Sequence, residues 1–169
     1  MKSIEISEHA SLEAMTPDTQ GELMTLIRLG KLSTDDVADY DGWLLAHAPD
    51  GEELVGCVGI ELRSPHAYME SLVVHPDARR QGLGGELTKR LFGLYIADSA
   101  DMDDLTAMTL FWNNRFYEAL GFERIDPRAA KMADDFAKPS AVKATTNGAA
   151  KVGKKDGKRG KKAATAAAG

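Results

Sequence analysis

The chain has 169 residues, of which 43% are apolar, so it is long enough for one domain with a buried core. Its apolar runs stop short of the roughly 18 residues that a membrane-spanning helix needs, and Met1–Glu5 lacks the apolar region of a secretory signal. The single cysteine, Cys57, excludes an internal disulfide, and no His, Cys or Asp cluster has metal-ligand spacing. We therefore expect a cytoplasmic protein without a metal site or a membrane contact.

Charge is distributed unevenly along the chain. The net charge is −5, but residues 138–169 carry nine Lys or Arg and one acid, Asp156, which leaves residues 1–137 at −13. After Pro139 the composition is mostly Lys, Ala, Gly and Thr, and little apolar burial remains to offset the entropy of ordering the backbone. We expect a folded domain over residues 1–137 and a disordered basic tail over residues 138–169.

The N-terminal third predicts one strand and two helices. Residues 3–7 alternate polar and apolar side chains, as in a half-buried edge strand. Thr16 is a suitable N-cap, the following proline suits the first helical turn, and Gly30 is a plausible helix end. A second cap at residues 33–36 predicts a short helix through Tyr40.

The middle of the chain predicts strands followed by a helix. Three apolar runs over residues 43–48, 53–62 and 68–74 are separated by turn residues, which favours an antiparallel meander. From Gly82 the apolar residues recur at helical spacing. The remaining predicted elements are a strand over 105–111, a short helix over 114–120 and a strand over 122–125.

The stretch from Leu72 to Gly85 combines a strand that stops at a proline, a basic loop and a helix start. Backbone N–H groups at such a start bind phosphates, and glycines at 82 and 84 let a pyrophosphate approach the backbone. Arg79 and Arg80 add positive charge. The loop lacks the Gly-Lys-Ser/Thr of a P-loop and the third glycine of a dinucleotide fold.

Two motifs here resemble those of the GNAT superfamily of N-acetyltransferases. Arg79-Arg80-Gln81-Gly82-Leu83-Gly84 is similar to its acyl-CoA motif, Arg/Gln-x-x-Gly-x-Gly/Ala, and Tyr117-Glu118-Ala119-Leu120-Gly121-Phe122 is similar to its Tyr-x-x-x-Gly-Phe signature. The resemblance covers residues 3–126, including the order of the predicted elements. It implies an α/β GNAT fold, with a central mixed, mostly antiparallel sheet flanked by helices.

The resemblance implies that acetyl-CoA is bound as a co-substrate. Its pyrophosphate would lie on the loop amides, and its pantetheine would pair with the strand that ends at Val74. The cofactor-binding residues expected on this basis are Leu72, Val73, Val74, Arg79, Arg80, Gln81, Gly82, Leu83, Gly84, Gly85, Asn113 and Tyr117. The resemblance also implies that Tyr117 is the general acid near the thioester sulfur and that the Val74 N–H is the oxyanion donor.

Acyl transfer to an amine also requires a base, because a protonated amine has no lone pair with which to attack. Glu70 lies on the strand that leads to the loop, with the same alternation as Leu72 and Val74, and could accept the proton directly or through water. Its alternative is an ordinary strand glutamate. Glu61 on the preceding strand is a rival candidate, and His75 is either a base or a loop end beside the cofactor.

The acceptor is predicted to be the primary amine of a small molecule, attacked in a ternary complex. The ending Gly-Phe-Glu-Arg-Ile-Asp-Pro-Arg resembles small amino-acid N-acetyltransferases of the arsenic-operon and N-acetylglutamate-synthase-like groups, although Leu110–Asn114 replaces their Thr-rich loop. Trp112 and Trp43 are candidates for the acceptor pocket, with strand core as the alternative for Trp43.

Other readings stay open. The acceptor could be a protein or peptide, or the chain could be a non-catalytic acyl-CoA-binding module tethered to nucleic acid by its basic tail. Such a tail predicts weak contact with nucleic acid or another polyanion. The sequence is compatible with a monomer or a homodimer.

Overall fold

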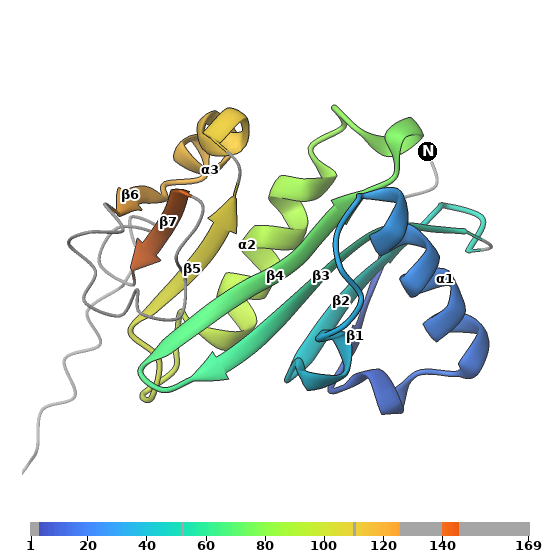
Figure 1. Cartoon of the computed structure of the whole chain (residues 1–169), viewed down its shortest axis with the longest axis horizontal. Coiled ribbons are helices and arrows are strands. Elements are labelled where there is room, and N and C mark those ends of the chain that lie inside the picture. Colours follow the sequence, from blue (N-terminus) through green and yellow to red (C-terminus); the bar gives the residue numbers. More distant parts are fainter. Residues whose placement is uncertain (1–3, 52, 110, 126–139, 146–169) are drawn as a thin grey trace, which may run out of the picture.

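The computed structural model describes residues 4–51, 53–109, 111–125 and 140–145. Within these ranges the chain forms a seven-stranded sheet with the order β1-β2-β3-β4-β5-β7-β6 (Figure 1). The strands are β1 (Glu5–His9), β2 (Gly42–His47), β3 (Leu54–Arg63), β4 (His66–Val74), β5 (Asp104–Thr109), β6 (Glu123–Ile125) and β7 (Ser140–Thr145). The α-helices are α1 (Pro17–Leu29), α2 (Leu83–Tyr95) and α3 (Asn114–Ala119). Among the strands of the described residues, only the β4–β5 pair is parallel, which confirms the predicted mixed, mostly antiparallel sheet.

Helix α1 begins as its sequence predicts. The Thr16 side-chain oxygen accepts a hydrogen bond from the Thr19 N–H at 3.2 Å, and Gly30 is the C-cap residue. The second predicted helix is wrong in type, because Val37–Asp39 forms only a short 3₁₀ turn. The side chain of its N-cap residue, Asp36, makes no capping hydrogen bond, so the predicted cap does not start a helix.

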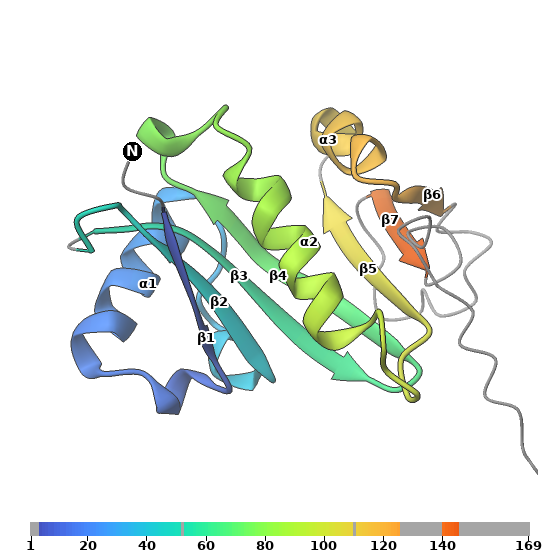
Figure 2. The ribbon, with the colours of Figure 1, turned by 180° about the vertical axis from the view of Figure 1, so that it is seen from behind.

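The two faces of the sheet carry separate cores, as the twofold alternation of strand side chains requires. Helix α1 packs Leu23 and Ile27 against one face, with Trp43, Leu45 and Cys57. Helix α2 covers the opposite face of the sheet, which is turned toward the viewer in Figure 2. The core there contains Leu44, Val58, Ile60, Leu87 and Leu91. In the described part of the chain, no helix is long and apolar enough to cross a membrane.

Strand β4 contains a bulge that changes which side chains share a face. Glu70 pairs with Gly59 but Val73 pairs with Cys57, so β4 has an extra residue here, and Ser71 adopts a φ of 50°. Glu70 therefore lies on the α1 face, whereas Leu72 and Val74 pack against the α2 core. The predicted common alternation of these three residues is wrong, because a bulge leaves no regular mark in the sequence.

Strands β4 and β5 pair only over part of their length. Their parallel register runs from His66–Asp104 to Met69–Ala107, and beyond it the two strands diverge (Figure 1). The last residues of β4 therefore have no strand partner on the β5 side. This opening lies at the same end of the sheet as the start of α2 and the whole of α3.

A strand lies beyond the boundary that the sequence predicts between domain and tail, which stays a prediction. Ser140–Thr145 forms β7, which pairs antiparallel with β5 on one side and β6 on the other. Backbone hydrogen bonds to two neighbours stabilise this strand, and these bonds depend on the neighbours rather than on composition. The predicted disorder of the rest of the tail, residues 146–169, lies outside the described residues, as do residues 126–139.

Candidate active site

A cavity of about 820 Å³ lies beside the last residues of β4, between them and the segment of residues 112–117 that follows β5. It extends from the C-terminal end of α1 to the first turn of α2 and to α3. Of the predicted cofactor-binding residues, all except Gln81 line it. Its wall is formed by Gly30, Lys31, Leu32, Leu72, Val73, Val74, Ala78, Arg79, Arg80, Gly82, Leu83, Gly84, Gly85, Trp112, Asn113, Phe116 and Tyr117.

The first turn of α2 presents backbone N–H groups to this cavity. Its N-cap, Gly82, has a φ of 83° and provides no side chain to cap the helix. The first N–H groups of a helix have no intrahelical partner and lie at its positive end. Gly84 adds no side chain beside these N–H groups, and a Cβ there would be in ordinary contact with the Phe116 ring, at 3.4 Å. The residues present therefore fit the anionic pyrophosphate of an acyl-CoA.

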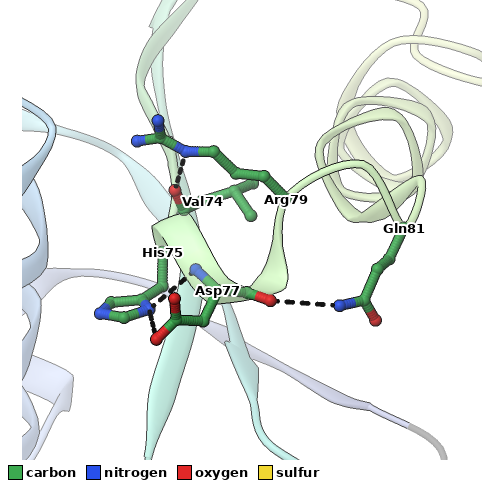
Figure 3. Close-up of polar contacts among 5 residues, drawn as sticks. All are labelled: Val74, His75, Asp77, Arg79 and Gln81. Atoms are coloured by element: carbon green, nitrogen blue, oxygen red, sulfur yellow. Dashed lines mark hydrogen bonds and ion pairs between the residues drawn. The ribbon is translucent and has the colours of Figure 1, made fainter.

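A network of polar contacts holds the loop between β4 and α2 (Figure 3). The Gln81 side-chain amide donates to the Asp77 carbonyl at 3.3 Å. The His75 Nδ1 accepts from the Asp77 N–H at 3.4 Å and lies 3.8 Å from its carboxylate. Gln81 thus supports the loop from within and does not reach the cavity.

The two arginines of the loop line the cavity differently. The Arg79 Nε donates to the Val74 carbonyl at 2.9 Å, so this side chain reaches back to the end of β4 (Figure 3). Arg80 adopts a left-handed φ of 61°. Together they place two positive charges at the wall where a pyrophosphate would bind.

The backbone of Val74 faces the cavity. The next residue, His75, donates its N–H to the carbonyl of Val55 in β3, at 2.8 Å. Because successive residues of an antiparallel strand alternate in hydrogen-bond direction, the Val74 N–H and carbonyl point away from β3, toward the opening. The Val74 N–H is therefore available to a ligand in the cavity, and its role as an oxyanion donor stays a prediction.

Tyr117 is a buried wall residue whose phenol is held in its neutral form. Burial raises its pKa to about 12, a nearby Glu70 adds to the rise, and a side-chain hydrogen bond with Thr109 opposes it. The ring packs edge-on against Phe116 and Phe122, at centroid distances of 4.9 and 5.4 Å. At neutral pH this phenol can donate a proton but cannot act as a base.

Glu70 lies on the α1 face beside this cavity and is not part of its wall. Its pKa is raised from 4.5 to about 7, mainly by burial and also by the negative charges of Glu61 and Asp36, against the opposing effect of Arg63. The negative charge of Glu70 contributes in turn to the raised pKa of Tyr117. A carboxyl group with this pKa is suited to exchange protons near neutrality.

The rival base candidates have other roles in the structure. Glu61 forms an ion pair with Arg63, at 2.6 Å between Oε1 and Nη2. His75 belongs to the loop network (Figure 3). Cys57, which is not a base candidate, is buried in the core, its Sγ donates to the Ser71 carbonyl at 3.4 Å, and burial raises its pKa to about 12. The buried carboxyl group of Glu70, with its pKa of about 7, therefore remains the candidate base.

Sequence reasoning missed several residues around the site. Tyr40 lies over Gly59, and its hydroxyl is 3.4 Å from the Ser71 Oγ, beside Glu70. Thr109 was also missed, because its role depends on where β5 ends. Trp112 lies on the cavity wall, as one hypothesis for it required, whereas Trp43 is fully buried in the core. The sequence alone does not predict that Tyr40 lies near Glu70, because their proximity depends on how the strands pair.

Comparison with known proteins supports a family assignment. Residues 39–124, just over half of the chain, match the model of the acetyltransferase (GNAT) domain. The chain matches none of the curated proteins. Among the described residues, no group of three or more His, Cys, Asp or Glu side chains could hold a metal ion.

Solved structures of low sequence identity share the fold. A GNAT-family acetyltransferase from Staphylococcus aureus Mu50 has a TM-score of 0.68 at 16% identity, over 85% of this chain and 99% of that one. An acetyltransferase from Streptococcus agalactiae 2603 has a TM-score of 0.67 at 20% identity, over 86% and 99%. The N-acetylglutamate synthase of Neisseria gonorrhoeae, complexed with coenzyme A and N-acetyl-glutamate, has a TM-score of 0.65 at 14% identity, and the match spans 86% of this chain but only 36% of that one.

The family match and the geometry of the site agree with each other. The matched residues contain β4, the loop and α2, and the cavity lies beside the last residues of β4. The chain therefore belongs to the GNAT acetyltransferase family.

Proposed function

We propose that this protein transfers an acetyl group from acetyl-CoA to the primary amine of a small molecule, by direct attack in a ternary complex. The observation that carries this proposal is the buried Glu70, with its pKa of about 7, on the strand whose end lines the cavity, together with the protonated Tyr117 on the cavity wall. The phosphate-binding loop forms another part of the same cavity. Acetyl-CoA would supply the thioester, and the chain's own residues would supply proton transfer and charge stabilisation.

Glu70 accepts the proton of the amine in this mechanism. An alkylammonium group has a pKa of about 10.4, so an ordinary carboxylate is a poor base for it. The pKa of about 7 brings Glu70 closer to that of the amine while leaving about half of it ionised at neutral pH. A water molecule between the two groups would serve the same transfer.

The Val74 N–H and the Tyr117 phenol act on the other charges that the reaction develops. The Val74 N–H points into the opening and donates to the carbonyl oxygen as that oxygen becomes negative. The protonated Tyr117 phenol donates a hydrogen bond to the departing thiolate and so stabilises its negative charge. No covalent intermediate with the protein is needed.

The surroundings of Glu70 favour a cationic acceptor. Asp36 and Glu61 contribute negative potential there, and the one nearby cation that acts on Glu70, Arg63, is paired with Glu61. Negative potential concentrates a protonated amine near the base. The N-acetylglutamate synthase with a related fold supports an amino-acid acceptor, and the same potential suits a lysine-containing peptide as the alternative.

The test is release of CoA thiol from acetyl-CoA by the purified full chain across amino acids, diamines, aminoglycosides and basic peptides. Mass spectrometry of the mixture identifies the acetylated product. We expect turnover with at least one small amine, and intersecting initial-velocity lines that indicate a ternary complex. Turnover with peptides alone would replace the small-molecule acceptor by a protein. Acetyl-CoA binding without turnover of any amine would favour a non-catalytic acyl-CoA-binding module.

A further inference from the structure

The segment between α1 and β2 places the Tyr40 side chain over the middle of the sheet. This segment lies on the face of the sheet that α1 covers (Figure 1). The Tyr40 ring lies over Gly59 of β3, where an added Cβ would lie 2.5 Å from the Tyr40 Cδ2 and 3.0 Å from its Cε2. The ring thus occupies the space that a side chain at residue 59 would fill.

Gly59 is the cross-strand partner of both Trp43 and Glu70. It pairs with Trp43 of β2 on one side and with Glu70 of β4 on the other. Side chains of directly opposed residues share a face of the sheet, and their Cβ atoms are about 4.5–5.5 Å apart. The Tyr40 ring therefore lies beside both of these side chains, and its centroid is 5.1 Å from that of Trp43.

The hydroxyl end of Tyr40 reaches the bulge of β4. Its oxygen lies 3.4 Å from the Oγ of Ser71, the residue that follows Glu70. Burial raises the pKa of Tyr40, the hydrogen bond with Ser71 opposes this rise, and the negative charge of Glu70 adds to it. Tyr40 thus extends alongside Glu70, from its cross-strand partner to the next residue of its own strand.

The charged groups that act on Glu70 come from two parts of the chain. Glu61 and Arg63 belong to β3, and Asp36 precedes the short 3₁₀ turn before β2. Their effects on the pKa of Glu70 are smaller than that of burial. The phenol of Tyr117 on α3 is neutral at pH 7. A substitution at residue 40 removes none of these groups, so it changes mainly the access of water to Glu70.

We propose that Tyr40 is a positioning residue for the base, because its ring covers one side of the Glu70 carboxyl group and excludes water from it. This inference rests on the proposed acetyltransferase function, in which Glu70 accepts the proton of the amine. Tyr40 acts through Glu70 and takes no part in the proton transfer itself. The ring of Tyr40 is therefore required, and its hydroxyl is not.

The test compares removal of the ring with removal of the hydroxyl alone. In wild type, kcat/KM should rise through an apparent pKa of about 7. Tyr40→Ala admits water to Glu70, so this limb should move down by roughly one pH unit. Tyr40→Phe keeps the ring and should leave the limb in place. An unmoved limb in Tyr40→Ala, or an equal shift in Tyr40→Phe, would overturn the proposal.

Tyr95 provides the matched control for the loss of a partly buried tyrosine. Burial also raises its pKa, but its side chain packs against the core on the α2 face of the sheet. Tyr95→Ala should lower the melting temperature and leave the pH limb in place. A shift of the limb in Tyr95→Ala as large as that in Tyr40→Ala would overturn the proposal, because any loss of packing would then have the same effect.

A titration of the carboxyl group itself tests the contact without turnover. In the full chain, isotopically labelled at the glutamate carboxyl carbons, the Glu70 resonance is the one that Glu70→Gln removes. It should titrate near pH 7 in wild type and in Tyr40→Phe, and at lower pH in Tyr40→Ala. If Tyr40→Ala does not fold, Tyr40→Leu, which keeps part of the contact with Trp43, should show a smaller shift in the same direction.

The titration separates the two claims from each other. If Glu70 titrates at the same pH in wild type and in the folded alanine or leucine variant, the proposal for Tyr40 is overturned. If the wild-type chain acetylates no amine, the proposed function fails, and the titration still decides whether Tyr40 shields Glu70 from water.

Discussion

The carboxyl group of Glu70 is placed where its ionised form is unfavourable. Burial and the charges of Glu61 and Asp36 act against ionisation, and the nearest opposing charge belongs to an arginine already paired with Glu61. Enzymes accept such a cost when the group must exchange a proton near neutral pH. The sequence could identify Glu70 as a candidate, but it could not predict the pKa, since Asp36 and Tyr40 reach this point only through the folding of a distant segment.

The raised pKa of Glu70 predicts that the free energy of unfolding depends on pH. Because the pKa of Glu70 is higher in the folded chain, the folded state binds its proton more tightly, and stability falls as pH rises from 4.5 through about 7. Glu70→Gln should therefore raise the melting temperature above pH 7 and change it little below pH 4.5. Thermal unfolding at the two pH values checks this. A variant that is less stable than wild type at pH 8 would contradict the assigned environment.

Tyr117 allows a separate prediction about the leaving group. Tyr117→Phe removes the hydroxyl but keeps the ring that packs against Phe116 and Phe122, so the cavity should stay intact. We expect kcat to fall on the order of 10²-fold, the lower range for loss of a general acid, with unchanged affinity for CoA by calorimetry. Tyr95→Phe is the control, since Tyr95 also has a raised pKa but lies outside the cavity wall. Equal losses in both variants would contradict a specific role for Tyr117.

At the scale of the elements, the loop and the helix after it were predictable and the bulge was not. The glycines and arginines of residues 79–85 indicate a phosphate site because their chemistry is local. The bulge at Ser71 places Glu70 and Leu72 on opposite faces of the sheet. It arises because β4 has one more residue than β3 over this stretch of their pairing. Ser71 is not a residue that favours a positive φ, so no sequence signal indicated it.

Gly82, the N-cap of α2, and Gly93 within the helix have equally open surroundings but differ in backbone conformation, so replacing each by Ala tests the effect of conformation alone. A Cβ would meet nothing within 4 Å at either Gly82 or Gly93, but only Gly82 has a positive φ, of 83°. Gly82→Ala should cost about 1–2 kcal/mol of unfolding free energy and raise the KM of acetyl-CoA. Gly93→Ala should stabilise the helix by about 0.5–1 kcal/mol and leave KM unchanged. Urea unfolding and steady-state kinetics measure both. Equal effects of the two substitutions would contradict the role of the left-handed turn.

At the scale of the whole molecule, the composition of residues 140–145 did not indicate that they form a strand of the sheet. Residues 140–145 contain Ala, Thr, Lys and one Val, which resembles a tail, but two neighbouring strands pair with them. The antiparallel meander of β2, β3 and β4 followed from three apolar runs separated by turn residues. Strand insertion between β5 and β6 depends on partners far away in sequence, and local patterns do not encode it.

Two truncations distinguish the strand from the residues after it. Deletion of 138–169 removes β7 and should lower the melting temperature strongly, because β5 and β6 lose the strand that joins them. Deletion of 146–169 leaves β7 in place and should change the melting temperature little. Similar melting temperatures for the two truncated chains would contradict the contribution of β7.

We propose in addition that the basic segment after β7 contacts polyanions. Residues 146–169 contain seven Lys or Arg and one acid, whereas residues 1–137 carry a net charge of −13. Counterion release predicts weak, sequence-independent binding to duplex DNA that falls steeply with salt. Deletion of 146–169 should abolish a gel shift seen at low salt and leave acetyl transfer unchanged. A shift that survives this deletion would contradict the proposal.

The pH dependence of kcat/KM tests most directly the central claim, that Glu70 beside the cavity is the base for acyl transfer to an amine. In wild type, kcat/KM should rise with pH through an apparent pKa of about 7. Glu70→Gln should remove this limb and lower the rate on the order of 10²–10⁴-fold. Glu61→Gln should keep the limb but move it to lower pH, because the Glu61 charge raises the pKa of Glu70. An unchanged limb in Glu70→Gln would contradict the claim and transfer the role of base to another group.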